Sequence, residues 1–174
     1  MDDVSGPVAR LKKADLVFLS AHTPGDAATA VARPREAGFS GAILGGDGFD
    51  SETVWRRLPG IGNVFFTTHA YLGRDNPAPA VVAFRAAYQE AFAGSEPDAF
   101  AAHGYDSVRL IAAAIEEAGS DEPEAVLRAF ANLRKFKGVT GDFSYADGSR
   151  MPSKSVSIIE VAKGKRRLVK EIVP

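Results

Sequence analysis

One carboxylate in this sequence, Asp47, stands in a turn where it could bind a cation. The turn, Gly45-Gly46-Asp47-Gly48, follows an apolar run over residues 41–45 that has the length and composition of a buried strand. Glycines allow the backbone to turn tightly at this point. In open α/β sheets, ligands bind beyond the carboxyl ends of the strands. We therefore hypothesise that Asp47 holds the cationic group of a small ligand.

A second candidate, His22, follows another apolar run, residues 15–21. This run has the pattern of a parallel strand covered on both faces, so His22 should lie at the same sheet edge as Asp47. His69 also follows a predicted strand, over residues 61–68. We predict that His22 contacts the ligand. The same two strand ends supply the remaining predicted ligand-binding residues: Ser20, Ala21 and Gly46.

Metal ligation does not fit the spacing of the acidic and histidine residues. The three histidines lie far apart in the sequence, and none has a partner at the spacing of a His-x-x-x-His motif. Asp47 and Asp50 with Glu52 do not match the spacing of an EF-hand loop. We predict no metal site, and we assign Asp50 and Ser51 to the cap of a short helix over residues 50–57.

Nucleotide binding and nucleophilic catalysis are also disfavoured. Residues 46–51 begin like the dinucleotide fingerprint G-x-G-x-x-G but end in serine, and an acid in that turn would repel a phosphate. The chain has no Walker loop and no G-x-S-x-G nucleophile elbow. It has no cysteine, which excludes thiol catalysis, disulfides and thiolate metal sites. The sequence predicts a protein that is not an enzyme and needs no cofactor.

The composition is that of an ordinary soluble globular protein, with 45% hydrophobic and 25% charged residues. The net charge is −1, and the basic residues are scattered except at residues 163–167, which we interpret as a solvated hairpin turn. Nucleic acid is therefore not an expected partner. The first residues are acidic and lack the apolar region of a signal peptide. We expect either a cytoplasmic protein or a mature or truncated piece.

The elements that must position Asp47 and His22 alternate between helix and strand. Apolar spacing predicts the end of a helix over residues 4–14 and an alanine-rich helix over residues 24–37, with a kink or an early end at Pro34. Together with the three strands, this order is typical of βαβ units. The predicted fold class is α/β, a three-layer α/β/α parallel sheet that is incomplete in this chain.

The pattern changes after His69, where residues 69–79 are rich in turn formers. Three helices without an intervening strand are predicted next: 79–93, 98–118 and 122–132. The remaining residues alternate with period two, which predicts three final strands: 138–145, 155–161 and 167–172. The chain thus has a helical middle segment between two segments that contain strands.

Four segments resemble the periplasmic leucine/isoleucine/valine-binding protein family in the same order: 45–51, 64–69, 96–107 and 137–141. Members are extracytoplasmic receptors of branched-chain amino-acid ABC transporters, with the type I fold of two α/β lobes joined by three crossing strands. The resemblance covers essentially the whole chain but only the C-terminal half of such a receptor. It implies that residues 1–70 are part of ligand-binding lobe two. Residues 71–135 would be a helical segment of lobe one, and residues 136–174 would be strands returning to lobe two.

The resemblance also implies a function and roles for residues. The family's acid after the Gly-Gly turn binds the α-ammonium of the amino acid, and this acid maps onto Asp47. The loop residue after the preceding strand closes over the ligand and maps onto His22, where many members have tyrosine. The chain would be a substrate-binding component of an ABC importer for branched-chain or other amino acids, periplasmic, with an amino-acid ligand and a membrane permease as partners.

Two alternatives stay open. The first is a truncated module that binds no ligand and forms a homo-oligomer through an exposed sheet edge, because unpaired strand edges recruit partners. The second is a cytoplasmic ligand sensor or enzyme built on the same fold, which analogy of fold does not exclude.

Overall fold

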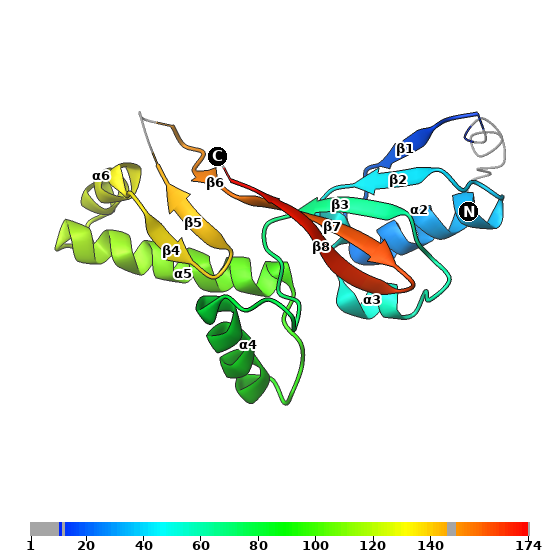
Figure 1. Ribbon diagram of the computed structural model, residues 1–174. Helices are drawn as coiled ribbons and strands as arrows, with labels where there is room; N and C mark the ends of the chain where they lie inside the picture. Colours follow the sequence, from blue (N-terminus) through cyan, green and yellow to red (C-terminus); the bar gives the residue numbers. More distant parts are fainter. Residues whose placement is uncertain (1–10, 12, 146–148, 174) are drawn as a thin grey trace. The chain divides into compact units, whose positions relative to one another are not determined.

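The computed structural model describes residues 11, 13–145 and 149–173, which form two compact units (Figure 1). The first unit contains the described residues up to Thr68 together with 157–171, and the second contains residues 69–156 and the last residues of the chain. The helix predicted over 4–14 lies largely outside the described residues. The chain therefore leaves the first unit after Thr68 and returns to it at Ser157.

A five-stranded sheet organises the first unit, in the order β1-β2-β3-β7-β8. Its strands are β1 (Leu16–Leu19), β2 (Ala42–Gly45), β3 (Val64–Thr68), β7 (Val156–Ala162) and β8 (Lys165–Ile172). Strands β1, β2 and β3 are parallel, and β7 runs antiparallel to β3. Short apolar runs with intervening helices produce this parallel arrangement, because each helix carries the chain back to the start of the next strand. The predicted α/β fold class is confirmed.

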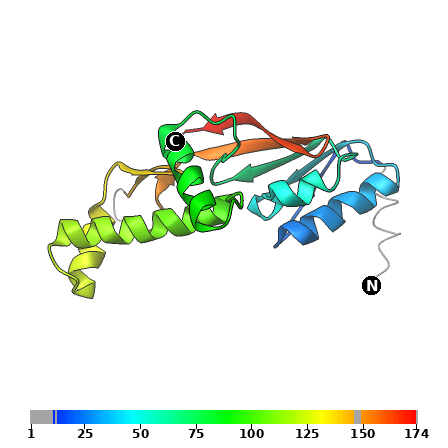
Figure 2. The same ribbon diagram turned by 90° about the horizontal axis from the view of Figure 1, so that it is seen from below.

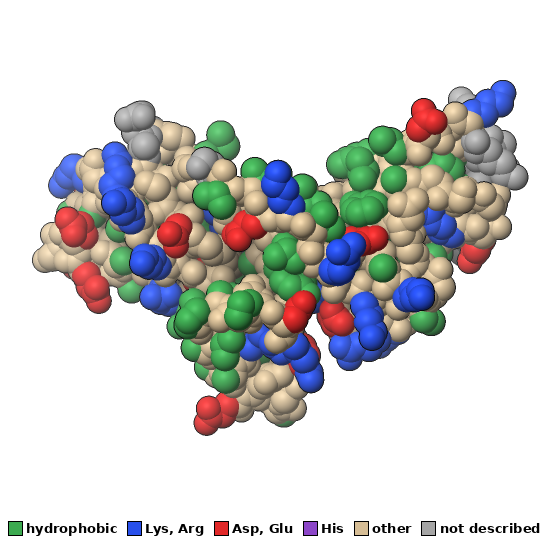
Figure 3. Space-filling view, in the orientation of Figure 1, with side chains coloured by type: hydrophobic (Ala, Val, Ile, Leu, Met, Phe, Trp, Pro, Cys, Tyr) green, Lys and Arg blue, Asp and Glu red, His purple; other side chains and the backbone are tan. Residues whose placement is uncertain are grey.

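Two helices cover one face of this sheet (Figure 2): α2 (Pro24–Glu36) and α3 (Glu52–Arg56). The hydroxyl of Thr23 caps α2 by accepting the N–H of Asp26 at 3.2 Å. The helix continues through Pro34 and ends two residues later, at Glu36, so it does not end at Pro34. Figure 3 shows hydrophobic side chains over β1, where Leu16 and Phe18 are 52% and 65% exposed.

The second unit contains the helices α4 (Pro79–Ala91), α5 (Ala99–Ala118) and α6 (Pro123–Asn132). The same unit contains a three-stranded antiparallel sheet, which consists of β4 (Phe136–Gly138), β5 (Gly141–Ser144) and β6 (Ser153–Lys154). Asp98 caps α5 by accepting the N–H of Ala101 at 2.8 Å, and Gly119 ends it with a φ of 61°. A small apolar cluster forms its core: Ala70, Leu72, Val81, Phe84, Ala102 and Val139.

The strand predicted over residues 138–145 is shorter in the structure: β5 spans Gly141–Ser144, and residues 138–140 form the end of β4 and the turn of a hairpin. The buried carboxylate of Asp106 on α5 accepts the N–H groups of Val139 and Thr140, at 2.9 and 2.8 Å, and the Thr140 hydroxyl at 2.8 Å. These backbone donors therefore bond to α5 rather than to a neighbouring strand, and the chain reverses between β4 and β5. A Cβ on Gly138 would lie 2.5 Å from the Asp106 carboxylate, so glycine permits this close approach.

The C-terminal strands are divided between the two compact units. The resemblance implies that residues 136–174 return to the lobe of residues 1–70, and in the structure residues 136–156 belong to the compact unit of the helices. Only the segment from Ser157 onward returns to the first unit, where β7 pairs with β3. The assignment of these segments to the two lobes of a receptor stays a prediction. Within the described residues, no helix is long and apolar enough to cross a membrane.

Candidate functional site

The predicted ligand-binding residues lie at the carboxyl ends of two adjacent strands. The register pairs Leu19 of β1 with Gly45 of β2, so Ser20 and Gly46 leave the sheet from neighbouring positions. Asp47 follows as the first residue of the 3₁₀ turn η1 (Asp47–Phe49), and it is exposed. The structure thus brings together the two strand ends that the sequence predicted to share an edge.

Gly48 fixes the distance between these two strand ends. A Cβ on Gly48 would overlap the carbonyl oxygen of Ala21 and would lie 3.4 Å from the carbonyl carbon of His22. The backbone of Ala21 and His22 therefore packs directly on the turn that carries Asp47. His22 is exposed, like Asp47. A carboxylate and an imidazole thus occupy adjoining loops, where both can reach a solvent-borne ligand.

Aromatic packing holds the Asp47 turn rigidly on the sheet. Phe49 is fully buried. Its ring occupies the space that a side chain at position 45 would need, because a Cβ on Gly45 would lie only 2.6 Å from the ring. The ring lies 5.9 Å from that of Trp55 and 6.2 Å from that of Phe66, between centroids. The Phe49 carbonyl accepts the indole N–H of Trp55 at 2.6 Å. The turn is therefore preorganised, which lowers the entropy lost when a ligand binds.

Asp50 is not a helix cap, contrary to the sequence analysis. Ser51 alone caps α3, accepting the N–H of Val54 at 3.3 Å. Asp50 is 1% exposed, accepts the Thr68 hydroxyl at 2.5 Å and forms an ion pair with Arg166 of β8. A buried carboxylate requires such partners, because desolvation of an isolated charge is costly.

Arg166 corrects a second expectation, that residues 163–167 are a solvated turn. Its side chain is 6% exposed, and its Nε also donates to Glu52 at 2.9 Å. Only the part around Lys163 forms the turn between β7 and β8. Asp50, Thr68 and Arg166 thus tie the Asp47 turn to the end of β3 and the start of β8, and we call these three residues the anchor triad.

Arg35 holds together the amino ends of β2 and β3, opposite the strand ends that carry the candidate site. The guanidinium of Arg35 donates to the carbonyls of Phe39 and Gly41, at 2.7 and 2.8 Å, and to those of Gly62 and Asn63, both at 3.0 Å. These carbonyls belong to the chain just before β2 and β3. Burial lowers the pKa of Arg35 from its ordinary value. Arg35 holds the starts of the two strands together, which keeps their carboxyl ends in register.

The histidines His69 and His103 belong to the second unit, and their rings lie in contact, with centroids 4.1 Å apart and planes tilted by 36°. The Lys154 ammonium donates to the carbonyls of His69 and Thr140, at 2.6 and 2.5 Å, and lies 5.1 Å from the centre of the Phe143 ring. Sequence reasoning missed the His69–His103 contact, and no local signal could have revealed it. In the described part of the chain, no group of three or more His, Cys, Asp or Glu side chains could hold a metal ion.

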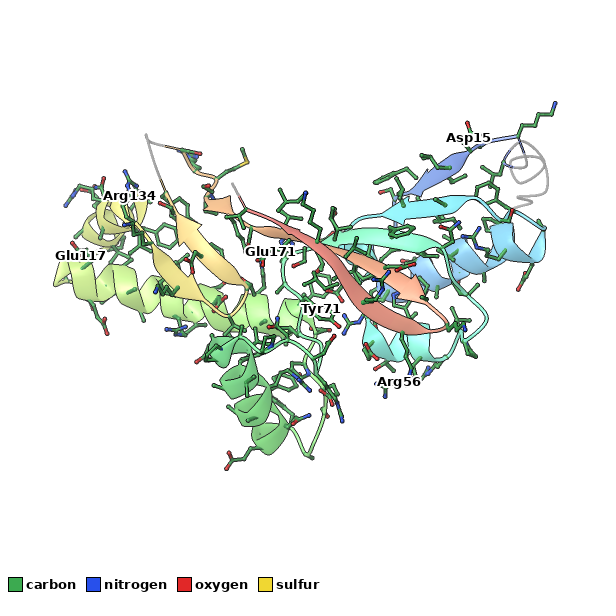
Figure 4. All side chains as sticks on the ribbon, viewed as in Figure 1. Asp15, Arg56, Tyr71, Glu117, Arg134 and Glu171 are labelled. Carbon is green, nitrogen blue, oxygen red and sulfur yellow. The ribbon has the colours of Figure 1, made fainter. Side chains whose placement is uncertain are left out.

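A surface cavity of about 550 Å³ lies elsewhere, beside α5 and α6 in the second unit. Glu117 and Arg134, both labelled in Figure 4, are among the residues that line it. None of the predicted ligand-binding residues lines this cavity. It therefore gives no support to the strand-end site.

Known proteins that are similar to this chain are binding proteins. Residues 2–166 match a family described as "Periplasmic binding protein". A curated relative, the Leu/Ile/Val-binding protein homolog 1 of Brucella suis, is 30% identical in an alignment of 147 residues that covers 82% of this chain and 38% of the relative. The chain thus spans well under half the length of this relative.

Solved structures show the same relationship. The leucine-binding protein LivK of Thermotoga maritima has a TM-score of 0.83 and 28% identity, over 99% of this chain and 49% of that protein. The branched-chain amino-acid transporter substrate-binding protein LivJ of Streptococcus pneumoniae, solved with isoleucine, has a TM-score of 0.81 and 25% identity, over 99% and 48%. Nearly all of this chain therefore superposes on about half of each structure.

Proposed function

This chain belongs to the periplasmic binding protein family, and from that premise we propose that it acts in the substrate-binding component of an ABC importer for branched-chain amino acids. The observation that carries the proposal is the exposed Asp47 on a rigid turn at the carboxyl end of β2, beside the end of β1. We assign to Asp47 the contact with the α-ammonium of the ligand.

The chemistry of an amino acid fits this edge of the sheet. A carboxylate forms a charge-assisted hydrogen bond with an ammonium, which is stronger than a bond between neutral groups. We place Ser20, Ala21, His22 and Gly46 around the same ligand, with His22 next to its side chain. The relatives' names support this ligand class, since one is a leucine-binding protein and another was solved with isoleucine.

The site in this chain is one part of a receptor site, because the chain spans only 38 to 49% of the relatives. The groups that hold the ligand's carboxylate would then come from the other half. We therefore expect the chain alone to bind amino acids weakly. A membrane permease as partner and a periplasmic location follow from the same proposal.

Calorimetric titration of the chain with leucine, valine and phenylalanine tests the proposal. We expect millimolar or tighter binding of at least one amino acid, and at least tenfold weaker binding by the Asp47→Asn variant, since the charge-assisted bond is lost. A leucine analogue without its amino group should not bind, because it lacks the ammonium.

Asp15→Asn is the matched control for Asp47→Asn. Asp15 is also exposed, but it precedes β1 and so lies at the opposite end of that strand (Figure 4). Its variant should bind like the unmodified chain. Absence of heat with every amino acid, or equal affinity of the Asp47 variant, would contradict the proposal for this chain.

A further inference from the structure

Four exposed basic side chains lie close together in the first unit. Arg56 is the last residue of α3, and Arg57 follows it. Lys163 and Lys165 lie on either side of Gly164, where the chain turns from β7 into β8. Figure 3 shows Lys and Arg side chains gathered over α3 and this turn. We call Arg56, Arg57, Lys163 and Lys165 the basic patch.

Gly164 brings the two segments of the basic patch into contact. A Cβ on Gly164 would lie 2.9 Å from the carbonyl oxygen of Trp55 and 3.1 Å from the Cα of Pro59. The turn therefore packs directly on the backbone that carries Arg56 and Arg57. Glycine permits both this contact and the local φ of 72°. Folded backbone thus holds the four positive charges next to one another.

The segments that form the basic patch carry no acid of their own. Residues 53–63 and 161–170 contain neither Asp nor Glu. Glu52, which precedes the first segment, binds two arginines: Arg166 at 2.9 Å and Arg56 at 3.2 Å. One carboxylate therefore serves two guanidinium groups, which leaves an excess of positive charge.

The other three members of the patch have no acidic partner in the described part of the chain: Arg57, Lys163 and Lys165 form no salt bridge there. Basic residues at the end of a helix also interact favourably with its dipole, which gives Arg56 and Arg57 a second role. This role does not extend to the two lysines. Because the net charge of the whole chain is −1, the positive charge of the patch is a local feature.

The basic patch lies at the edge of the sheet opposite the candidate site. Val161 of β7 pairs with Val64, the first residue of β3, so the turn after β7 lies beside the amino end of β3. Asp47 follows the carboxyl end of β2, which is parallel to β3. A partner that binds the patch therefore leaves the ligand-binding edge of this unit open.

We propose that the basic patch binds the surface of a bilayer that contains anionic phospholipids. Exposed Lys and Arg side chains attract anionic headgroups, and each one strengthens binding roughly fivefold. A protein partner would need an apolar centre in the interface, where charged residues are depleted, whereas a lipid surface requires only the charge that the patch supplies. The proposal does not depend on amino-acid binding by this chain.

Sedimentation of the full chain with lipid vesicles tests the proposal. One set of vesicles contains phosphatidylcholine and phosphatidylglycerol in equal parts, and the other contains phosphatidylcholine alone. The test variant is the double substitution Lys163→Gln, Lys165→Gln, which removes two charges from the patch and leaves the candidate site intact. Each measurement is made at low ionic strength and at about 0.15 M salt, where the Debye length is about 8 Å.

The matched control is the double substitution Arg128→Gln, Lys137→Gln in the second unit. It changes the net charge by the same amount and also replaces exposed residues. Its two basic residues have acidic neighbours, because Arg128 lies 3.7 Å from Glu124 and Lys137 pairs with Asp142 across the β4–β5 hairpin. Both double variants should keep the urea midpoint of the unmodified chain, since exposed substitutions change stability little.

We expect the unmodified chain to sediment with the anionic vesicles at low ionic strength and not with the neutral ones. Binding should weaken severalfold at the higher salt concentration, because salt screens exposed charges. The variant with substitutions at positions 163 and 165 should bind at least tenfold more weakly, and the control should bind like the unmodified chain.

Four results would overturn the proposal. One is no sedimentation with anionic vesicles at low ionic strength, and another is equal sedimentation with both kinds of vesicle. Equal weakening by both double variants would show that only net charge matters. Binding of soluble polyglutamate that requires the two lysines, without binding of vesicles, would show that the patch takes an acidic protein. Leucine titration enters none of these measurements, so a failure of the receptor function stays distinguishable.

Discussion

At the scale of single residues, the candidate site depends on glycines and on one buried acid. Gly48 allows the two strand ends to touch, and Gly45 makes room for the ring of Phe49. Asp50 looks like a helix cap in the sequence, yet its carboxylate is buried with Thr68 and Arg166. The exposed Asp47 and the buried Asp50, three residues apart, therefore differ: Asp50 supports the turn, and Asp47 carries the ligand contact that we propose.

The Asp50→Ala variant should lose about 3–5 kcal/mol of unfolding free energy, because it leaves Arg166 buried without one of its charge partners. Urea denaturation measures this loss. The double variant Asp50→Ala, Arg166→Met should recover part of it, since the unpaired charge is also removed. A single variant within about 0.5 kcal/mol of the unmodified chain, the usual range for neutral surface changes, would show that the anchor triad does not support the fold.

At the scale of elements, the hairpin β4–β5 depends on a helix rather than on its own turn. Three hydrogen bonds from residues 139 and 140 end on the Asp106 carboxylate of α5. A buried acceptor of this kind replaces the partners that the two amides would have in a longer strand. Helix α5 therefore supports the hairpin through a side chain on its buried side.

Removal of this acceptor in Asp106→Ala should destabilise the second unit by about 2–4 kcal/mol, since buried donors lose their partner. Hydrogen exchange should show that the amides of Val139 and Thr140 lose protection first. Ser107→Ala, the exposed neighbour on the same helix, serves as the control and should leave both amides protected. Retained protection in the Asp106 variant would argue that the turn is held by other contacts.

At the scale of the whole molecule, two compact units with separate cores should respond separately to acid. Glu96 of the second unit binds Arg74 and Arg85. Desolvation alone would raise the pKa of Glu96, but the hydrogen bonds and charges of these arginines hold it below its ordinary value of 4.5. The lowered pKa means that this stabilisation is complete above pH 4.5 and is lost as the pH falls through the folded-state pKa.

The Glu96→Gln variant should be less stable than the unmodified chain by about 1 kcal/mol at neutral pH, the scale of a partly exposed ion pair. The difference should shrink as the pH falls below 4.5, because the unmodified glutamate then also becomes neutral. Urea denaturation over a series of pH values measures both effects. A difference that stays constant with pH would mean that the charge of Glu96 does not stabilise the second unit.

The sequence alone determined the local features of this protein. Apolar periodicity and glycine positions predicted strands over residues 15–21 and 41–45, the three helices of the middle segment, and the turn that carries Asp47. These features depend on neighbours within a few residues, so their signals are present in short windows of sequence. The parallel arrangement of the first strands followed from the same order of elements.

Only the tertiary structure decided which distant polar groups meet. The pairing of Asp50 with Arg166 joins residues 116 positions apart, and the bond from Thr140 to Asp106 joins residues 34 positions apart. Which distant residues become partners depends on how the strands and helices pack. A buried charge is stable only where the fold places an opposite charge or a hydrogen-bonding group beside it. The same packing placed the end of β4 and a turn in the first residues of the strand predicted over residues 138–145.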